Sequence, residues 1–240
     1  MDTLHVSSLK PRMIAHRGLS GIEMENTCAA FVAAGNRSFF GIETDVHRTR
    51  DGQYIIIHDD DTLRVSGRSM TVEETDFDVL RALRLLDRGG QPGRGDLVLP
   101  TLREYVGICK KYEKTAVLEL KNHFEQADIE AIIGIVRDEK WLENTIFISF
   151  DLPNMVCVRS LLPQQPAQYL IEEKVPEDLL DTLSRFRLDL DIDHHLLTKD
   201  LADACRERGI HINVWTVNTL EDARRMIALG VDFITSNILE

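Results

Sequence analysis

Short apolar or β-branched runs alternate with amphipathic stretches along the whole chain. Strands that alternate with helical segments indicate a parallel sheet with helical crossovers. The pattern therefore predicts an α/β protein. The runs expected to form its strands are residues 13–16, 41–47, 53–58, 115–121, 145–150, 167–171, 188–193, 211–217 and 232–235.

These nine runs exceed by one the number that a barrel of eight strands requires, and the third run is the surplus one. It follows the second run after Thr49-Arg50-Asp51-Gly52, a tight Asp-Gly turn. Such a turn joins antiparallel strands, whereas a parallel crossover needs about a dozen residues. Residues 53–58 are therefore expected to form a hairpin arm beside eight parallel strands, and the predicted fold is a (β/α)8 TIM barrel.

The expected helices carry ordinary start and stop signals. Thr27 and Thr198 can cap the starts of two helices, and the stretch Thr101 to Glu104 resembles a capping box. Gly209 and Gly230 stand where the helices expected at 199–208 and 220–229 should end.

One long interruption, at about residues 61–99, separates the hairpin arm from the next expected helix. It contains the glycine-rich run Gly89-Gly90-Gln91-Pro92-Gly93-Arg94-Gly95. A stretch of this length exceeds a plain connector, so we expect a small inserted lobe or a lid. A disordered surface loop is the alternative for the glycine-rich part.

Length and charge narrow the class of protein. The 240 residues match the roughly 250 of a single TIM barrel, so one domain, 1–240, is expected. Forty acidic residues against 28 basic ones give a net charge of −12, which repels nucleic acids and anionic membranes. We expect no nucleic-acid partner and no stable membrane anchoring; a homo-oligomer is left open. An anionic substrate would need positive charge supplied locally.

Cysteines and hydropathy give the expected location. Cys28, Cys109, Cys157 and Cys205 form no Cys-x-x-Cys pair, so reduced thiols are expected. The first residues lack the apolar stretch of a signal peptide, and no later apolar run approaches 18 residues. The prediction is a soluble cytoplasmic protein.

Polar residues are concentrated where the expected strands end, and strand ends converge on one mouth of a TIM barrel. Glu43 and Asp45 are two residues apart, so both side chains leave the same face of their strand, and Glu119 and Lys121 repeat this spacing. Three carboxylates in one mouth would repel one another unless a cation neutralised them. Oxygen ligands alone favour Mg²⁺ or Ca²⁺, so Glu43, Asp45 and Glu119 are the expected metal ligands.

Two histidines flank these acids at strand ends. Imidazole titrates near neutrality, so His16 and His58 can supply the acid and the base for displacement at phosphorus. Arg17 can bind two phosphate oxygens at once, and Lys121 can add a second positive charge. An ion pair with Glu119 would explain Lys121 equally well.

At these residues the sequence resembles the glycerophosphodiester phosphodiesterase family. The resemblance is ordered and spans nearly the whole chain. Its pieces are Ile14-Ala15-His16-Arg17-Gly18, Glu25-Asn26-Thr27, Gly41-Ile42-Glu43-Thr44-Asp45-Val46, Arg50-Asp51-Gly52, His58-Asp59, Leu63-Arg64, Leu99-Pro100-Thr101-Leu102, Leu118-Glu119-Leu120-Lys121, Ser149-Phe150, Val214-Trp215-Thr216-Val217-Asn218 and Gly230-Val231-Asp232.

The resemblance implies a divalent-metal barrel enzyme that cuts glycerophosphodiesters to glycerol 3-phosphate and an alcohol. It implies the same ligands, acid–base pair and phosphate contacts as above. It also implies that the segment after His58-Asp59 is the family's small lobe beside the active site. The attacking group, water or a neighbouring glycerol hydroxyl, is left open.

Three features lie outside this resemblance. The chain ends its last strand with Ser236-Asn237, where the family commonly has Thr-Asp followed by a proline. Asp189, Asp191 and Asp193 alternate along another strand; we expect them at the rim in water, with a second cation site as the alternative. Trp215 should face the barrel interior, where it walls the substrate pocket or fills the core.

Two other functions remain as alternatives. One is a related barrel phosphodiesterase that acts on lysophospholipid-type diesters, which would need a long apolar groove. The other is a non-catalytic barrel that binds a phosphodiester, which would be indicated by loss of a histidine or carboxylate. A metal-dependent aldolase or enolase-type barrel would want a lysine base and leaves the histidine pair unexplained.

Overall fold

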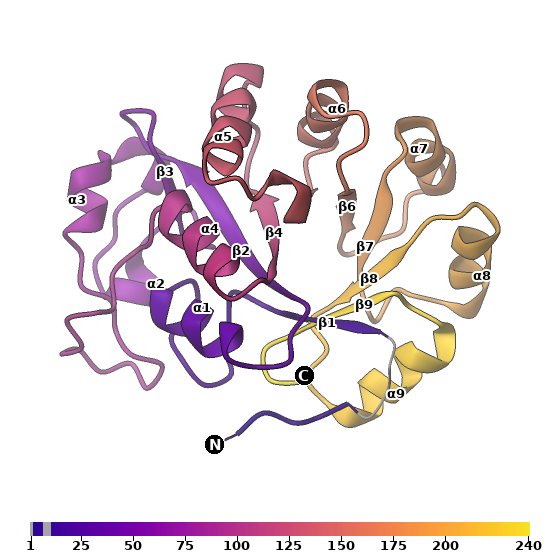
Figure 1. Ribbon diagram of the computed structural model, residues 1–240, viewed down its shortest axis with the longest axis horizontal. Coiled ribbons are helices and arrows are strands. Elements are labelled where there is room, and N and C mark those ends of the chain that lie inside the picture. The colour runs from indigo at the N-terminus through magenta and orange to yellow at the C-terminus, as the bar shows by residue number, and fades with distance from the viewer. Residues whose placement is uncertain (1, 7–10) are drawn as a thin grey trace.

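A computed structural model of the protein describes residues 2–6 and 11–240 (Figure 1). Its central feature is a closed barrel of parallel strands. β1 pairs with both β9 and β2, which closes the ring and confirms the predicted TIM barrel. The barrel strands are β1 (Arg12–Ala15), β2 (Gly41–Arg48), β4 (Thr115–Leu120), β5 (Thr145–Ser149), β6 (Ala167–Ile171), β7 (Asp189–Asp193), β8 (Ile212–Trp215) and β9 (Phe233–Ser236).

The remaining strand is the predicted hairpin arm. β3 (Tyr54–Ile56) pairs antiparallel with the end of β2, with Val46 opposite Ile56 and Arg48 opposite Tyr54. Gly52 in the turn has a φ of +78°, a conformation that favours glycine. The arm leads the chain back toward the barrel mouth, so that His58 follows it there.

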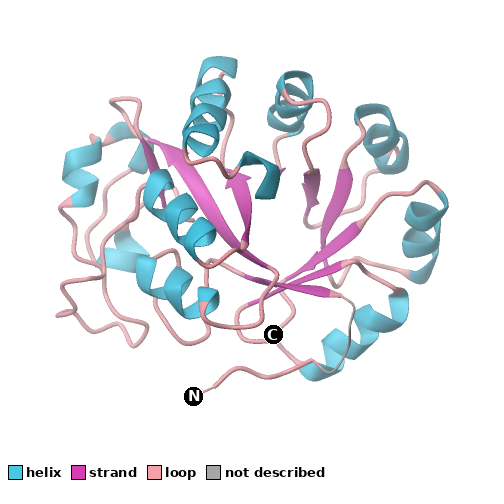
Figure 2. Cartoon of the chain, in the orientation of Figure 1, coloured by secondary structure: helices cyan, strands magenta, loops and turns pink. Residues whose placement is uncertain are grey.

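Helices surround the barrel (Figure 2). Thr27, Thr101 and Thr198 cap helix starts as predicted, and Thr101 forms the full capping box with Glu104. Gly230 ends the last helix in a left-handed conformation. The crossover helices are α1 (Cys28–Gly35), α4 (Leu102–Lys111), α5 (Gln126–Asp138), α6 (Leu152–Leu161), α7 (Leu179–Phe186), α8 (Lys199–Glu207) and α9 (Leu220–Leu229), with a short 3-10 turn, η2 (Leu142–Asn144), before β5.

Two apolar layers result from the alternation along the strands. Outward positions such as Ile212 and Val214 pack under the helices in the main core. Inward positions form a smaller cluster inside the barrel, where Trp215 packs near Ile148 and Leu170. Trp215 therefore faces the barrel interior, as its strand parity predicts.

The segment after the hairpin arm contains three short helical elements: α2 (Leu63–Ser66), η1 (Val72–Glu74) and α3 (Phe77–Arg81). Val65, Val72 and Leu80 are buried in a separate apolar cluster with Ile55 and Ile57 of the arm. The glycine-rich run 89–95 is exposed and lacks regular structure. Arg81 at the end of α3 donates to the carbonyl of Leu99, which joins this helix to the end of the segment.

Two further expectations are tested by the fold. All four cysteines are free, and none forms a disulfide. Among residues 2–6 and 11–240, no helix combines the length and the apolar character needed to cross a membrane.

The expectation that the aspartates of β7 lie in water at the rim is wrong for Asp191. Its side chain points into the barrel and is only 2% exposed. Asp189 and Asp193, at the two ends of β7, are partly exposed. They lie beside His211 and His195 respectively, so the three aspartates do not share one cation site.

Candidate active site

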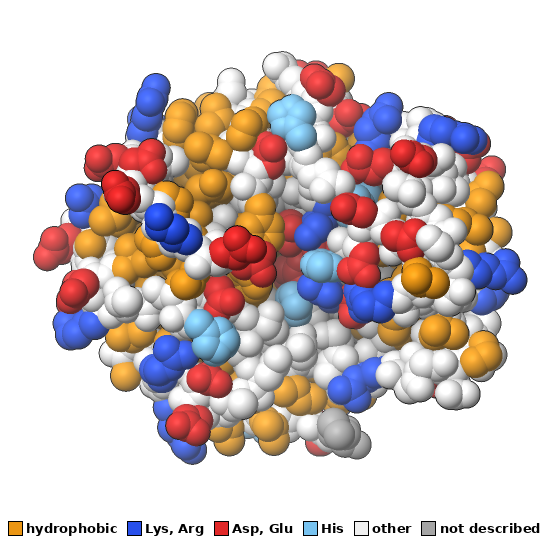
Figure 3. All heavy atoms as spheres, turned by 180° about the vertical axis from the view of Figure 1, so that it is seen from behind, with side chains coloured by type: hydrophobic (Ala, Val, Ile, Leu, Met, Phe, Trp, Pro, Cys, Tyr) orange, Lys and Arg blue, Asp and Glu red, His pale blue; other side chains and the backbone are white. Residues whose placement is uncertain are grey.

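A cavity of about 370 Å³ opens among the ends of the barrel strands. On this face of the molecule, acidic, basic and histidine side chains gather around a central hollow (Figure 3). Most of the predicted site residues line the cavity. The lining consists of His16, Arg17, Glu43, His58, Glu119, Lys121, Ile148, Phe150, Leu170, Glu172, Asp191, Trp215 and Thr235.

The three predicted metal ligands come together from two neighbouring strands. Glu43 and Asp45 lie on β2 and Glu119 on β4, where Asp45 is directly opposite Glu119. One carboxylate oxygen from each lies within 4.8 Å of the others. The residues are only 3, 1 and 7% exposed, so the three negative charges are held close together away from water.

This crowding separates the pKa values of the three acids. Burial, together with the charges of Asp45 and Glu119, raises the pKa of Glu43 well above its usual value. Burial and Asp45 raise the pKa of Glu119 to about 7. Burial also opposes ionisation of Asp45, but the charges of Arg17 and Lys121 outweigh it and lower its pKa to about 2.

The donor set fits a hard divalent cation. Asp45 Oδ1 is buried and accepts no hydrogen bond within the described structure, because Lys121 Nζ, 3.7 Å away, pairs with Glu119 Oε1 at 2.8 Å instead. A buried carboxylate oxygen without a donor is costly unless a cation satisfies it. All the ligand atoms on offer are oxygens, which Mg²⁺ and Ca²⁺ prefer.

Local structure holds the acids in place. Arg17 has a φ of +53°, and its backbone N–H donates to Glu43 Oε2 at 2.7 Å. The Asn26 amide donates to Asp45 Oδ2 at 2.7 Å and accepts from the hydroxyl of Thr44, also at 2.7 Å. One oxygen of Glu43 and one of Asp45 are thereby anchored.

Arg17 and Lys121, the two side chains predicted to contact phosphate, both form ion pairs with carboxylates. Lys121 Nζ is 2.8 Å from Glu119 Oε1, so the ion pair considered as the alternative for Lys121 is present. Arg17 Nη1 is 3.0 Å from Glu25 Oε1, and its Nε lies 3.6 Å from Asp45 Oδ2. Both side chains still line the cavity, where an anion could meet them.

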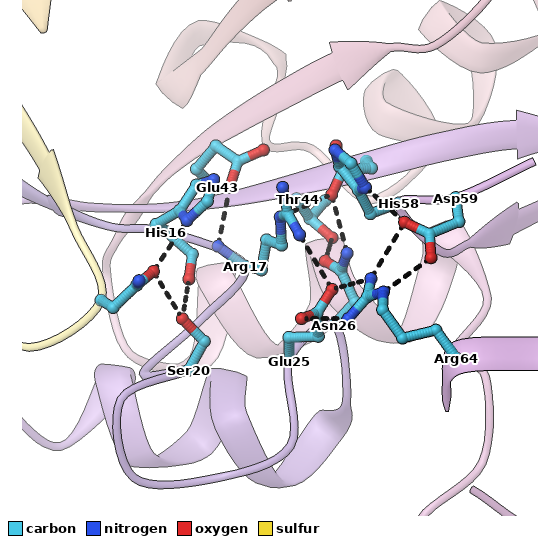
Figure 4. Close-up of polar contacts among 12 residues, drawn as sticks. His16, Arg17, Ser20, Glu25, Asn26, Glu43, Thr44, His58, Asp59 and Arg64 are labelled. Atoms are coloured by element: carbon cyan, nitrogen blue, oxygen red, sulfur yellow. Dashed lines mark hydrogen bonds and ion pairs between the residues drawn. The ribbon is translucent and has the colours of Figure 1, made fainter. Parts of the chain in front are cut away.

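His58 is backed by a chain of charged groups (Figure 4). Its Nδ1 lies 2.7 Å from Asp59 Oδ1, and Asp59 also accepts hydrogen bonds from Arg64. Arg64 donates to both oxygens of Glu25, which in turn pairs with Arg17. The network connects the hairpin arm and the following segment to the barrel.

His16 is backed by neutral groups instead (Figure 4). Its Nδ1 lies 2.7 Å from Asn237 Oδ1, and Ser20 Oγ contacts the same amide oxygen at 2.8 Å. The backbone N–H of Asn237 donates to Asn218 Oδ1. The departure Ser236-Asn237 from the family pattern thus supplies the partner of His16.

Several residues of the site had no predicted role. Glu25, Asn26, Asp59 and Arg64 occur in motifs that carried the family resemblance, which was the available signal. Asn237 and Asp191 were noted only as features outside it. Their roles depend on which strand ends meet, and that is set by closure of the barrel.

A second group of ligand-type atoms occurs outside the cavity, at Asp193, His194 and His195. His195 Nδ1 already lies 2.7 Å from Asp193 Oδ1. The guanidinium of Arg225 donates to His194 Nδ1 at 2.9 Å. The positive side chain of Arg225 therefore already occupies a ligand atom of this group.

The fold and the cavity define a TIM-barrel enzyme, because acids, histidines and cations converge at the strand ends where such enzymes react. The model of the glycerophosphoryl diester phosphodiesterase family matches residues 16–239, and the chain belongs to this family.

Individual relatives agree with this membership. The Bacillus subtilis protein YhdW is 32% identical over 234 residues, which cover 94% of this chain and 93% of the relative. A glycerophosphodiester phosphodiesterase of Caldanaerobacter subterraneus is 27% identical, with 95% of each chain covered. The solved structure of an Oleispira antarctica phosphodiesterase in complex with its product sn-glycerol-3-phosphate has a TM-score of 0.86 at 25% identity, covering 98% of this chain and 96% of that one.

Proposed function

We propose that the protein hydrolyses glycerophosphodiesters to glycerol 3-phosphate and an alcohol, with a divalent cation at Glu43, Asp45 and Glu119. The observation that carries the proposal is the cavity itself. It combines a cluster of buried, under-satisfied carboxylates with two histidines and two positive side chains. Family membership and the product-bound Oleispira relative support the substrate class.

The cation site is expected to take Mg²⁺ or Ca²⁺, because its ligands are oxygens only. A bound divalent ion acts as a Lewis acid that offsets charge on phosphate oxygens. It would also supply the partner that Asp45 Oδ1 lacks. Lys121 would then be partly released from Glu119 to meet the substrate.

The side chains around this site have distinct proposed tasks. Arg17 and Lys121 orient the phosphodiester and offset the negative charge that develops on its oxygens. His16 takes a proton from the attacking group, water or the neighbouring glycerol hydroxyl, and His58 gives a proton to the leaving oxygen. This assignment rests on their partners, since Asp59 stabilises a protonated His58 whereas Asn237 carries no charge.

We also propose that residues 1–240 form a single domain, in which the segment 61–99 has a structural task. Arg64 connects it to Asp59 and Glu25, one contact away from His58 and Arg17. We therefore propose that the segment is a small lobe that supports one edge of the mouth.

A coupled assay for glycerol 3-phosphate tests the proposed function. Glycerophosphocholine, glycerophosphoethanolamine and glycerophosphoglycerol are supplied with Mg²⁺ or Ca²⁺, and parallel samples receive excess chelator. We expect turnover of at least one diester, loss of turnover on chelation, and recovery when the ion is restored. Glu43→Gln should remove activity, while Glu207→Gln on the exposed surface of α8 should retain it. Turnover that survives thorough chelation would contradict the cation site.

A further inference from the structure

The cavity has a second side, built by β5, β6 and β8, whose walls are apolar. Ile148 lies on β5 and Leu170 on β6, while Phe150 directly follows β5 and Trp215 is the last residue of β8. The rings of Phe150 and Trp215 meet edge to face, with centroids 5.7 Å apart and planes at 89°. The walls therefore suit the carbon skeleton of a ligand.

The inner end of the same space is polar. Asp191 and Thr235, which we call the polar floor, are 2% and 3% exposed, while Phe150 at the rim is 39% exposed. Asp191 stands on β7 between Leu170 of β6 and Asn213 of β8. The Thr235 hydroxyl donates to Asn213 Oδ1 at 3.2 Å, which leaves the hydroxyl oxygen of Thr235 able to accept.

Two polar atoms of the residues that line this space are without partners. Asp191 Oδ1 and Trp215 Nε1 are buried and make no hydrogen bond to any described residue. A buried polar group left unpaired is costly, so most such groups in native proteins have a partner. A ligand that brings hydrogen-bonding groups to the floor would supply one.

The chemistry of Asp191 indicates which group fits. Burial, and then the charge of Glu119, raises the pKa of Asp191 well above its usual value. Asp191 Oδ1 can accept a hydrogen bond, and Trp215 Nε1 can only donate one. A hydroxyl, which also donates and accepts, matches this pair, whereas an ammonium group can only donate.

We propose that Asp191 is a specificity residue, which hydrogen-bonds a free hydroxyl of the substrate's glycerol unit at the polar floor. This inference rests on the proposed hydrolysis of glycerophosphodiesters. The three-carbon unit would lie between Trp215 and Leu170, with Trp215 Nε1 available to a second hydroxyl. Acylation of that hydroxyl would leave Asp191 buried against a hydrocarbon chain, so lysophospholipids should be poor substrates.

The test compares diesters that differ at one hydroxyl. Glycerophosphocholine, its analogue without the terminal glycerol hydroxyl, and lysophosphatidylcholine are each assayed by choline release. For the native enzyme, loss of the hydroxyl should lower kcat/KM roughly tenfold to a hundredfold, since a site built to bind a hydroxyl is left unpaired. Asp191→Leu should lower kcat/KM for glycerophosphocholine toward that of the deoxy analogue, so that the two substrates become nearly equal.

Conservative and control variants separate this role from a structural one. Asp191→Asn keeps a donor and an acceptor and should restore most of the discrimination. Asp193→Leu, two residues along the same strand but outside the cavity lining, should leave it unchanged. Thermal unfolding checks that each variant folds, and Asp191→Ala replaces Asp191→Leu if the larger side chain prevents folding.

A binding measurement distinguishes failure of this inference from failure of the proposed function. Calorimetric titration with glycerol 3-phosphate and with its deoxy analogue requires no turnover. A native enzyme that hydrolyses none of the diesters would overturn the proposed function, while the binding ratio would still test Asp191. Full discrimination by both Asp191→Leu and Asp191→Ala, in turnover and in binding, would overturn the inference.

Discussion

His16 and His58 line the same cavity, but the structure supports them in different ways. His58 lies against the carboxylate of Asp59, which is itself fixed by Arg64, whereas His16 lies against the neutral amide of Asn237. Burial, followed by the charge of Arg17, lowers the pKa of His16 to about 4. Burial also lowers the pKa of His58, but Asp45 and Asp59 oppose the shift.

This difference matters because acid and base need opposite proton affinities. A histidine that starts neutral can accept a proton, and one stabilised by a carboxylate is better able to carry one. Two residues of the same type can therefore divide the proposed proton transfers through their partners alone. Four substitutions test this comparison.

Removal of either imidazole should have the largest effect. His16→Ala and His58→Ala should each lower turnover of glycerophosphodiesters by roughly 10²–10⁴-fold, the usual contribution of a general acid or base. Affinity for Mg²⁺ or Ca²⁺, measured by calorimetry, should change little because neither residue is an expected ligand. His211→Ala at the opposite end of the barrel, where the side chain is 62% exposed, is the matched control. Near-normal turnover in either active-site variant would refute the acid–base pair.

Asp59→Asn should have the next largest effect, since it gives His58 a neutral partner like that of His16. Loss of the negative charge lowers the pKa of His58, so the histidine loses its proton at a lower pH. Turnover should fall roughly tenfold to a hundredfold, which is part of the contribution of the general acid. The alkaline limb of the pH dependence of turnover should move to lower pH. Asp61→Asn, in the same segment but outside the cavity lining, serves as the control. An alkaline limb that stays in place would argue against His58 as the acid.

Asn237→Asp is the reverse exchange, because it gives His16 a charged partner like that of His58. It should have the smallest effect on turnover. A carboxylate beside His16 raises its pKa, so the neutral form that accepts a proton persists only at higher pH. The acidic limb of kcat/KM should therefore shift upward, with a loss of roughly tenfold per unit of pKa on the acidic side. At alkaline pH the variant should approach the native rate. If the acidic limb does not move, His16 is not the base.

Much of the architecture could be predicted because strand parity and turn chemistry are local. The Asp-Gly turn identified the hairpin, and the spacing of Glu43 and Asp45 placed both on one face. Parity does not say how deep a residue lies, since depth depends on the stagger between strands. For that reason Asp191 was expected in water, although the structure buries it.

The partners of the histidines illustrate a second limit. Asp59 follows His58 directly, so the contact between the two side chains is local in the sequence. Asn237 lies 221 residues from His16, and the two meet only because β1 pairs with β9 when the barrel closes. Contacts made by closure depend on the whole ring, and a local pattern does not contain them.

The hairpin arm has a consequence for how such a site can diversify. His16 and the carboxylates belong to the barrel ring, but His58 is carried by an appendage that pairs with β2 and bridges to Thr101 before α4. The spacing between the two imidazoles is thus set by the arm and the segment that supports it. Changes in that arm can alter the size of the phosphodiester accommodated without disturbing the eight strands on which stability depends.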